Sequence, residues 1–257
     1  MPQFPPSLNE LMARGPVIGP INLIPSQPIV EQLCAAPFDF IWVDMEHGPH
    51  SVQDLGSAVS VCLGQGINPI VRVPCVDDWA AKWVLDQGVR GVIFPFVNTV
   101  EEAKQAVSAC KYPPAGHRGY FPDMAARRWG LDNFAYVEKA NEEICVILQI
   151  EHDDAVRRAS QIAAVEGWDL LFIGPMDLSS SYGKLGKIDD PQVDRAIDTV
   201  LRVAKFAGKR AGILAVTPED IKRRIDQGFD LIGVLPDIGI IGKAILDYWA
   251  SIEKALR

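Results

Sequence analysis

The sequence predicts an α/β protein whose parallel strands close into a (β/α)8 TIM barrel. Eight short apolar runs alternate with stretches of helical periodicity, and 257 residues suffice for eight such units. Continuously apolar strands are typical of a parallel sheet that is covered on both faces. An open doubly wound sheet is the alternative, but GPIN in the first strand is not the glycine-rich turn GxGxxG. We therefore expect one barrel domain over residues 1–257.

The expected strands are identified by apolar content, length and flanking turn residues. In chain order they are VIGPINLI (17–24), FDFIWVDM (38–45), NPIVRVP (68–74), GVIFPFV (91–97), ICVILQIE (144–151), DLLFIGP (169–175), RAGILAV (210–216) and LIGVLPD (231–237). Helices are expected at 77–88, 99–110, 191–208, 217–228 and from residue 238 to the end. Gly88, Gly208 and Gly228 should end three of them, because glycine accepts the left-handed conformation that follows many helices.

One long connection interrupts this pattern. Residues 112–130, YPPAGHRGYFPDMAARRWG, follow the fourth strand and the helix after it. The segment is too long and too rich in proline and glycine for a simple connector. We therefore expect an irregular loop near a functional site.

The composition indicates an ordinary globular protein of the cytoplasm. The net charge of -8 argues against a nucleic-acid partner. No run of about 18 apolar residues is present, and the start, MPQFPPSLNE, lacks the pattern of a secretory signal, so neither a membrane segment nor export is expected. The five cysteines are widely spaced without a CxxC pair, so reduced thiols are expected rather than disulfides or a zinc site.

Polar side chains stand at the ends of five of the expected strands. The carboxyl ends of barrel strands meet at one rim, where the active sites of such barrels are built. The set comprises Asp44, Glu46 and His47 after the second strand, Arg72 in the third, Gln149 and Glu151 in the fifth, Asp177 after the sixth and Asp237 after the eighth. We expect these groups to converge on one site.

Glu151 and Asp177 follow adjacent strands and form a candidate metal site. Two carboxylates suit a hard cation such as Mg²⁺ or Mn²⁺ and leave coordination positions for water and substrate. The alternatives are that Asp177 caps a short helix and that Glu151 meets solvent at a strand end. We favour the metal because the two residues occur together.

Arg72 and His47 are the candidate catalytic groups. A guanidinium that points into a barrel must be paired or must bind an anion, and Asp86 is one possible structural partner. His47 follows two acids, so a carboxylate can fix its tautomer while the other ring nitrogen acts as acid or base near neutral pH. The other histidines (His50, His117 and His152) are expected to have loop or surface roles.

The segment GPMDLSS (174–180) offers a site for a carboxylate. Backbone N–H groups at the start of a short helix can hold an anion beside the metal, and Gly174 allows close approach of the backbone. A small 2-oxo acid would fit, since it can bind a cation through a carboxylate oxygen and its ketone oxygen.

The chain resembles the HpcH/HpaI aldolases, a family of metal-dependent class II pyruvate aldolases that has macrophomate synthase as a relative. The resemblance spans nearly the whole sequence. The matching segments are VDMEHGPHS (43–51), PIVRVP (69–74), VLDQGVRGVIFPFV (84–97), YPPAGHRG (112–119), RRWG (127–130), QIE (149–151) and FIGPMDLSSSYG (172–183).

The resemblance implies a barrel of the phosphoenolpyruvate/pyruvate-binding type with a divalent metal, Mg²⁺, Mn²⁺ or Co²⁺, on Glu151 and Asp177. Pyruvate or another 2-oxo acid would bind this metal, with its carboxylate held by amides around Gly174 to Asp177. The residues implied to contact substrate are Gln149, Gly174, Pro175, Met176 and Asp177.

The resemblance also assigns catalytic roles and an assembly. Arg72 would stabilise the enolate oxygen, and Asp86 would orient Arg72 or water. His47, supported by Asp44 and water, would handle the proton of the aldol hydroxyl. Family members suggest a homo-hexamer built from trimers in which neighbours exchange the last helix.

Two positions depart from the family pattern. The eighth strand ends in the residues VLPD (234–237) instead of Gly-Val-Asp, and Met176 replaces a small residue between Pro175 and Asp177. The first change is expected to reshape the rim and alter the aldehyde pocket, and Met176 is expected to narrow the space beside the metal. Both should leave the core chemistry intact.

The expected activity is a lyase that cleaves a 4-hydroxy-2-oxo acid to pyruvate and an aldehyde, reversibly. A Schiff-base aldolase is disfavoured because no lysine lies in an expected strand. Oxaloacetate decarboxylation or a macrophomate-synthase-like reaction remains open, because either would use the same enolate. A non-catalytic barrel that binds an oxo acid is the more distant alternative.

Overall fold

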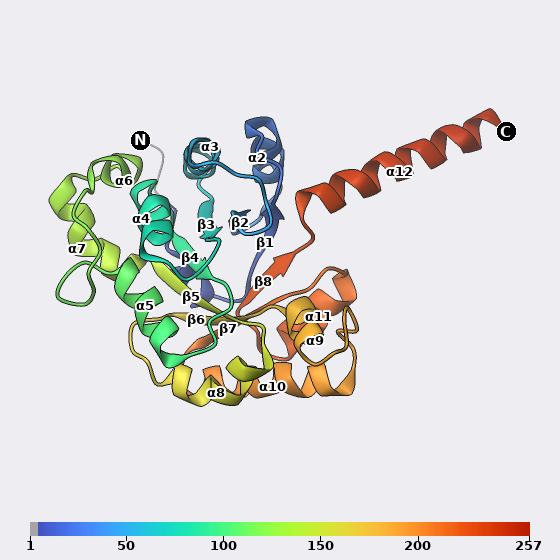
Figure 1. Ribbon diagram of the computed structural model, residues 1–257. Helices are drawn as coiled ribbons and strands as arrows, with labels where there is room; N and C mark the ends of the chain where they lie inside the picture. Colours follow the sequence, from blue (N-terminus) through green and yellow to red (C-terminus); the bar gives the residue numbers. More distant parts are fainter. Residues whose placement is uncertain (1–4) are drawn as a thin grey trace.

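The computed structural model describes residues 5–257, and its strands form one closed parallel barrel in chain order (Figure 1). The strands are β1 (Val17–Asn22), β2 (Phe40–Asp44), β3 (Asn68–Arg72), β4 (Gly91–Phe94), β5 (Cys145–Ile150), β6 (Leu170–Ile173), β7 (Arg210–Leu214) and β8 (Leu231–Val234). All eight predicted strands are confirmed, and the open sheet is wrong. Residues 1–4, the start of the segment MPQFPPSLNE, lie outside the described residues.

Helices surround the barrel. They are α1 (Leu8–Met12), α2 (Gln27–Cys34), α3 (Val52–Gly64), α4 (Asp78–Asp86), α5 (Val100–Cys110), α6 (Asp123–Arg128), α7 (Asn133–Glu143), α8 (Asp153–Ala163), α9 (Pro175–Ser181), α10 (Pro191–Phe206), α11 (Pro218–Asp226) and α12 (Asp237–Leu256). The helices predicted at 77–88, 99–110, 191–208 and 217–228 are α4, α5, α10 and α11. Gly88, Gly208 and Gly228 have positive φ angles of 80°, 68° and 97°, as helix-ending glycines should.

The prediction of an irregular loop over residues 112–130 is wrong in part, because α6 lies inside it. Ala125 and Ala126 of this helix are buried, and the buried ring of Trp129 packs edge to face on Tyr136 of α7 with 4.8 Å between centroids. A helix of six residues shows too little periodicity to be detected in the sequence. Tertiary packing decides its conformation.

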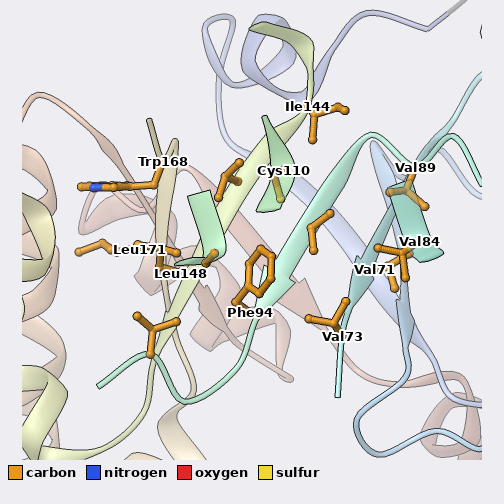
Figure 2. Packing of buried hydrophobic residues seen from close by; sticks show 14 of the residues in the cluster. Val71, Val73, Val84, Val89, Phe94, Cys110, Ile144, Leu148, Trp168 and Leu171 are labelled. Atoms are coloured by element: carbon orange, nitrogen blue, oxygen red, sulfur yellow. The ribbon is translucent and has the colours of Figure 1, made fainter. Parts of the chain in front are cut away.

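Alternation along the strands separates an inner from an outer core. Trp42 and Phe172 point into the barrel and meet edge to face with 5.0 Å between ring centroids. The next residues in each strand point the other way and pack against the helices. Figure 2 shows part of this outer core, in which Val71 and Leu148 lie among side chains from helices and loops.

The helix predicted from residue 238 onward is confirmed as α12. It extends away from the barrel (Figure 1). Within it, only Asp237 is buried. Apolar side chains are exposed along its length, including Ile245, Trp249 and Leu256, whose spacing places them on one face. No helix within residues 5–257 combines the length and hydropathy needed to cross a membrane.

We expect Gly19→Ala to destabilise the barrel. A Cβ atom at Gly19 of β1 would lie 2.2 Å from the carbonyl oxygen of Phe40 and 2.5 Å from its ring, so the two strands would have to move apart. Overpacking of this kind costs roughly 1–3 kcal/mol. The thermal midpoint should fall in Gly19→Ala and stay unchanged in Gly15→Ala, where nothing lies within 4 Å of the added atom. Equal midpoints in the two variants would contradict the expectation.

Candidate active site

A small cavity of about 130 Å³ lies at the carboxyl ends of the strands. Most of the predicted site residues line it: His47, Arg72, Gln149, Glu151, Gly174, Pro175, Met176 and Asp177. Its remaining walls are the apolar side chains of Ile21, Trp42, Phe172 and Leu214. A larger groove of about 710 Å³ between α8 and α10 contains none of these residues, so the smaller cavity is the candidate site.

Arg72 is held between two carboxylates. Asp44 and Arg72 are register partners on β2 and β3, and Asp44 accepts hydrogen bonds from Nε at 3.0 Å and from Nη2 at 2.5 Å. Glu46 lies 3.0 Å from Nη1 on the other side. Burial by itself would lower the pKa of Arg72, but the hydrogen bonds and the charge of Asp44 raise the pKa overall. The guanidinium is therefore a fixed positive charge on the cavity wall.

Glu151 is a buried carboxyl group at the end of β5. Burial, with repulsion from Glu46 and Asp177, raises its pKa to about 7 against the opposing effect of its hydrogen bonds. The backbone N–H of Phe96 donates to Oε1 at 2.9 Å, and the Gln149 amide donates to Oε2. Phe96 has a φ angle of 49°, a conformation that is rare outside glycine and that is found most often at functional sites.

Gly174 makes room for Glu151. A Cβ atom at residue 174 would lie 2.3 Å from Oε2 of Glu151, so only glycine fits here without displacing the carboxylate. Gly174 is the N-cap of α9, and Asp177 follows in the first turn of that helix. The predicted close approach to the backbone at Gly174 is confirmed, and the group that comes close is the Glu151 carboxylate.

The donor set fits a hard divalent cation. Besides burial, repulsion from Asp177 raises the pKa of Glu46, and repulsion from Glu46 and Asp177 raises the pKa of Glu151. A cation would remove this repulsion. Among residues 5–257, no group of three or more His, Cys, Asp and Glu side chains is arranged to hold a metal. Glu151 and Asp177 would therefore hold the cation together with ligands from water and substrate.

His47 lines the cavity, but its surroundings differ from the prediction. Asp44 binds Arg72 and accepts hydrogen bonds from the backbone N–H groups of Glu46 at 3.1 Å and His47 at 3.4 Å, so it does not bind the His47 ring. The ring lies instead 3.7 Å from Glu46, and the side chain is 59% exposed. Glu46 thus touches both candidate catalytic groups. Glu46 was predicted only as a polar group at the strand end, although its spacing of two residues from Asp44 indicates that both side chains point to the same side of the strand.

Asp86 is not brought to this cavity. It lies at the carboxyl end of α4, shortly before β4 begins, and therefore near the amino ends of the strands. Its carboxylate is 3.7 Å from the buried guanidinium of Arg118. Arg72 pairs with Asp44 and Glu46, so the suggested ion pair between Arg72 and Asp86 is wrong.

Asp237 has a structural position beside the site. It is buried and accepts hydrogen bonds from the Asn22 side chain at 2.7 Å and from the backbone N–H groups of Leu23 and Ile24 at 3.0 Å each. These bonds fasten the end of β1 to the start of α12. Asp237 does not line the cavity. Of the polar residues predicted at the strand ends, it therefore has a structural role and no catalytic one.

The closed parallel barrel, with carboxylates and a guanidinium above its strand ends, defines the chain as a barrel enzyme. The family model of the HpcH/HpaI aldolase/citrate lyase family matches residues 24–241. The chain therefore belongs to the HpcH/HpaI aldolase/citrate lyase family. The resemblance inferred from the sequence is confirmed, and with it the class of carbon–carbon lyases to which the named aldolases of this family belong.

Named relatives cover most of this chain. A 5-keto-4-deoxy-D-glucarate aldolase of Enterobacter sp. (strain 638) is 34% identical over 98% of both chains. A hydroxypyruvate/pyruvate aldolase of Chromohalobacter salexigens is 37% identical over 84% of this chain and 85% of the relative. The substrates in these two names differ, so family membership does not specify the substrate of this chain.

Solved structures agree with the fold. A HpcH/HpaI aldolase/citrate lyase family protein from Burkholderia cenocepacia J2315 has a TM-score of 0.88 at 32% identity, covering 95% of this chain and 99% of that chain. Macrophomate synthase has a TM-score of 0.84 at 26% identity, covering 99% of this chain and 92% of that chain. Both matches include the strands that carry the candidate site.

We expect the stability of the metal-free protein to fall as the pH rises from about 4.5 to about 7. The pKa of Glu151 is about 7 in the folded state against an ordinary value of 4.5, so the folded state binds this proton more tightly than the unfolded state. The proton on Glu151 therefore stabilises the fold fully below pH 4.5, and this stabilisation is lost as the pH rises through about 7. The free energy of unfolding should fall by up to about 3 kcal/mol.

Urea unfolding of chelator-treated protein between pH 4.5 and pH 8 measures this effect. Glu151→Gln should flatten the pH dependence, because it removes the titrating group. Glu101→Gln, at an exposed position of α5, should keep the slope of the unchanged protein. Parallel slopes in the unchanged protein and in Glu151→Gln would assign the pH dependence to other groups.

Proposed function

We propose that this chain cleaves 4-hydroxy-2-oxo acids to pyruvate and an aldehyde, and that it catalyses the reverse aldol addition with a divalent cation held by Glu151 and Asp177. One observation carries the proposal. A fixed guanidinium and two carboxyl groups line the same small cavity at the strand ends. This combination suits a reaction in which negative charge develops on a bound 2-oxo acid.

The proposed cation is Mg²⁺ or Mn²⁺, and Co²⁺ also suits an oxygen-rich site. When bound, it would supply positive charge beside the 2-oxo group. The residues of the chain hold it in place: the Phe96 N–H and the Gln149 amide orient Glu151, and α9 positions Asp177.

Arg72 and the start of α9 would bind the oxo acid. The first N–H groups of a helix have no acceptor within it, so those of Met176 and Asp177 can hold the substrate carboxylate. A guanidinium has five N–H groups. Two of those in Arg72 donate to Asp44, and Nη1 lies 3.0 Å from Glu46. The N–H groups that do not bind Asp44 can donate to the 2-oxo oxygen as it becomes an enolate.

His47 would act as the base, directly or through a water molecule. An imidazole near neutral pH can accept the proton of the 4-hydroxyl group. Loss of this proton lets the C3–C4 bond break, the aldehyde leave and the electron pair pass into the pyruvate enolate. Glu46, 3.7 Å from the ring, would stabilise the imidazolium that forms.

Two other uses of the same enolate are alternatives. Oxaloacetate decarboxylation or a macrophomate-synthase-like reaction would need the same cation site and the same Arg72. The similarity of the fold to that of macrophomate synthase supports the macrophomate-synthase-like reaction as an alternative. Release of pyruvate from a 4-hydroxy-2-oxo acid, abolished by EDTA and restored by Mn²⁺, separates aldol cleavage from these reactions and from a non-catalytic binding role.

A homo-oligomer, specifically a hexamer of two trimers, is proposed as the working form. The exposed apolar face of α12 needs a partner surface, and Trp79 and Trp83, one turn apart on α4, form a second exposed apolar surface. Two separate surfaces suit the two kinds of contact in a dimer of trimers. The cytoplasmic location stays a prediction.

We expect Glu151→Gln to lose bound metal and activity together, because it removes a charged ligand. Arg72→Ala should keep the metal and lose turnover by roughly 10²–10³-fold, the usual cost of deleting one group that stabilises an oxyanion. Metal content by mass spectrometry and pyruvate release report both properties. Glu101→Gln is the control, and normal turnover in Arg72→Ala would remove that residue from the mechanism.

The double variant Leu246→Glu with Trp249→Glu should disrupt assembly, because both side chains are exposed apolar groups of α12 and buried carboxylates would be costly at an interface. Sedimentation velocity should show a smaller species than the unchanged protein forms. The exposed Lys254→Glu change adds the same kind of charge to the helix and serves as the control. An unchanged sedimentation coefficient in the double variant would exclude α12 from the interface.

A further inference from the structure

The burial of the binding groups separates the positions of the two reactants. Arg72 and Glu151, which would hold the oxo acid and its cation, are only 7% and 1% exposed. The oxo acid would therefore occupy the buried part of the cavity. The aldehyde must therefore lie at the mouth, next to the carbon of pyruvate to which it is joined.

The mouth has an apolar side. Met176 lines the cavity and remains 50% exposed, so its side chain reaches from the cavity wall to solvent. Leu214, at the end of β7, is partly buried against the inner core and lines the same cavity. A thioether and an isobutyl group offer contact to an alkyl chain and no hydrogen bond to a carboxylate.

Carboxyl groups outnumber the lysine and arginine side chains in and beside the cavity. Arg72 is the only lysine or arginine among the cavity-lining residues, and its charge is shared with Asp44 and Glu46. Glu151 and Asp177 add two more carboxyl groups. The carboxylates of Glu151 and Asp177 would offset the charge of a divalent cation, and pyruvate would add one more negative charge, so no free positive charge from the cation would remain for a second anion.

We propose that the aldehyde partner is an uncharged, short-chain aldehyde whose chain lies against Met176 and Leu214, and that aldehydes carrying a carboxylate are disfavoured. This inference depends on the proposed aldolase function and specifies its acceptor. In the addition, a bond forms between C3 of pyruvate and the aldehyde carbon, one proton leaves C3 and one proton reaches the new hydroxyl group. No other reactant is needed.

Butanal and 4-oxobutanoate provide a matched pair of acceptors. Both have four carbons and an unbranched aldehyde, and they differ in the terminal methyl or carboxylate group. With pyruvate and Mn²⁺, kcat/KM for butanal should exceed that for 4-oxobutanoate by at least about tenfold. Equal values, or a preference for 4-oxobutanoate, would overturn the inference.

Substitution of Met176 tests whether this residue carries the preference. Met176→Arg should raise kcat/KM for 4-oxobutanoate relative to butanal at least about tenfold, because it places a positive group at the mouth. Met176→Lys is a second variant with the same expected direction. Met124→Arg introduces the same charge at a similarly exposed methionine of α6, outside the cavity, and should leave the ratio unchanged. An unchanged ratio in both Met176 variants would refute the assignment of Met176.

Hydrogen–deuterium exchange at the pyruvate methyl group separates this inference from the proposed function. NMR detects the exchange in the absence of any aldehyde, so it reports enolate formation alone. Exchange together with a preference for 4-oxobutanoate would refute the uncharged acceptor and leave the enolate chemistry intact. Absence of exchange and of addition with both aldehydes would refute the aldolase function, and the acceptor inference with it.

Discussion

The site depends on the alternation of side chains along the barrel strands. Trp42 and Asp44 share the inward side of β2, and Phe172 and Gly174 share that of β6, so each strand has apolar groups low in the barrel and site residues at its end. A shift of one residue would turn all of these groups toward the helices. The closed barrel prevents such a shift because every strand is paired on both sides.

The same register creates the charge pattern of the cavity. Asp44 stands opposite Arg72 in the β2–β3 pairing and binds its guanidinium. The guanidinium is therefore fixed at the cavity wall, and its charge is partly neutralised. Carboxyl groups outnumber it, and burial weakens the screening that water would provide. A site of this kind favours the binding of a cation and of one small oxo acid that is bound to that cation. Selectivity against a second anion is a consequence of the same excess of negative charge.

Most of the fold and most of the site could be predicted from local patterns. The strands are continuous apolar runs, and Arg72, Glu151 and Asp177 interrupt or end them with ionisable groups. The short helix α6 could not be predicted, since Ala125 and Ala126 become buried only by tertiary packing. The pairing of Asp86 with Arg118 was missed for a similar reason, because 32 residues separate them in the chain.

Sequence alone determined that this chain forms a parallel barrel with acidic residues at its strand ends, because periodicity and strand-end composition are local properties. Only the tertiary structure decided which distant groups contact each other: Glu46 with Arg72, and the Phe96 N–H with Glu151. These contacts join segments from different strands and loops. Their distances follow from how the barrel closes, and no local pattern in the chain encodes them.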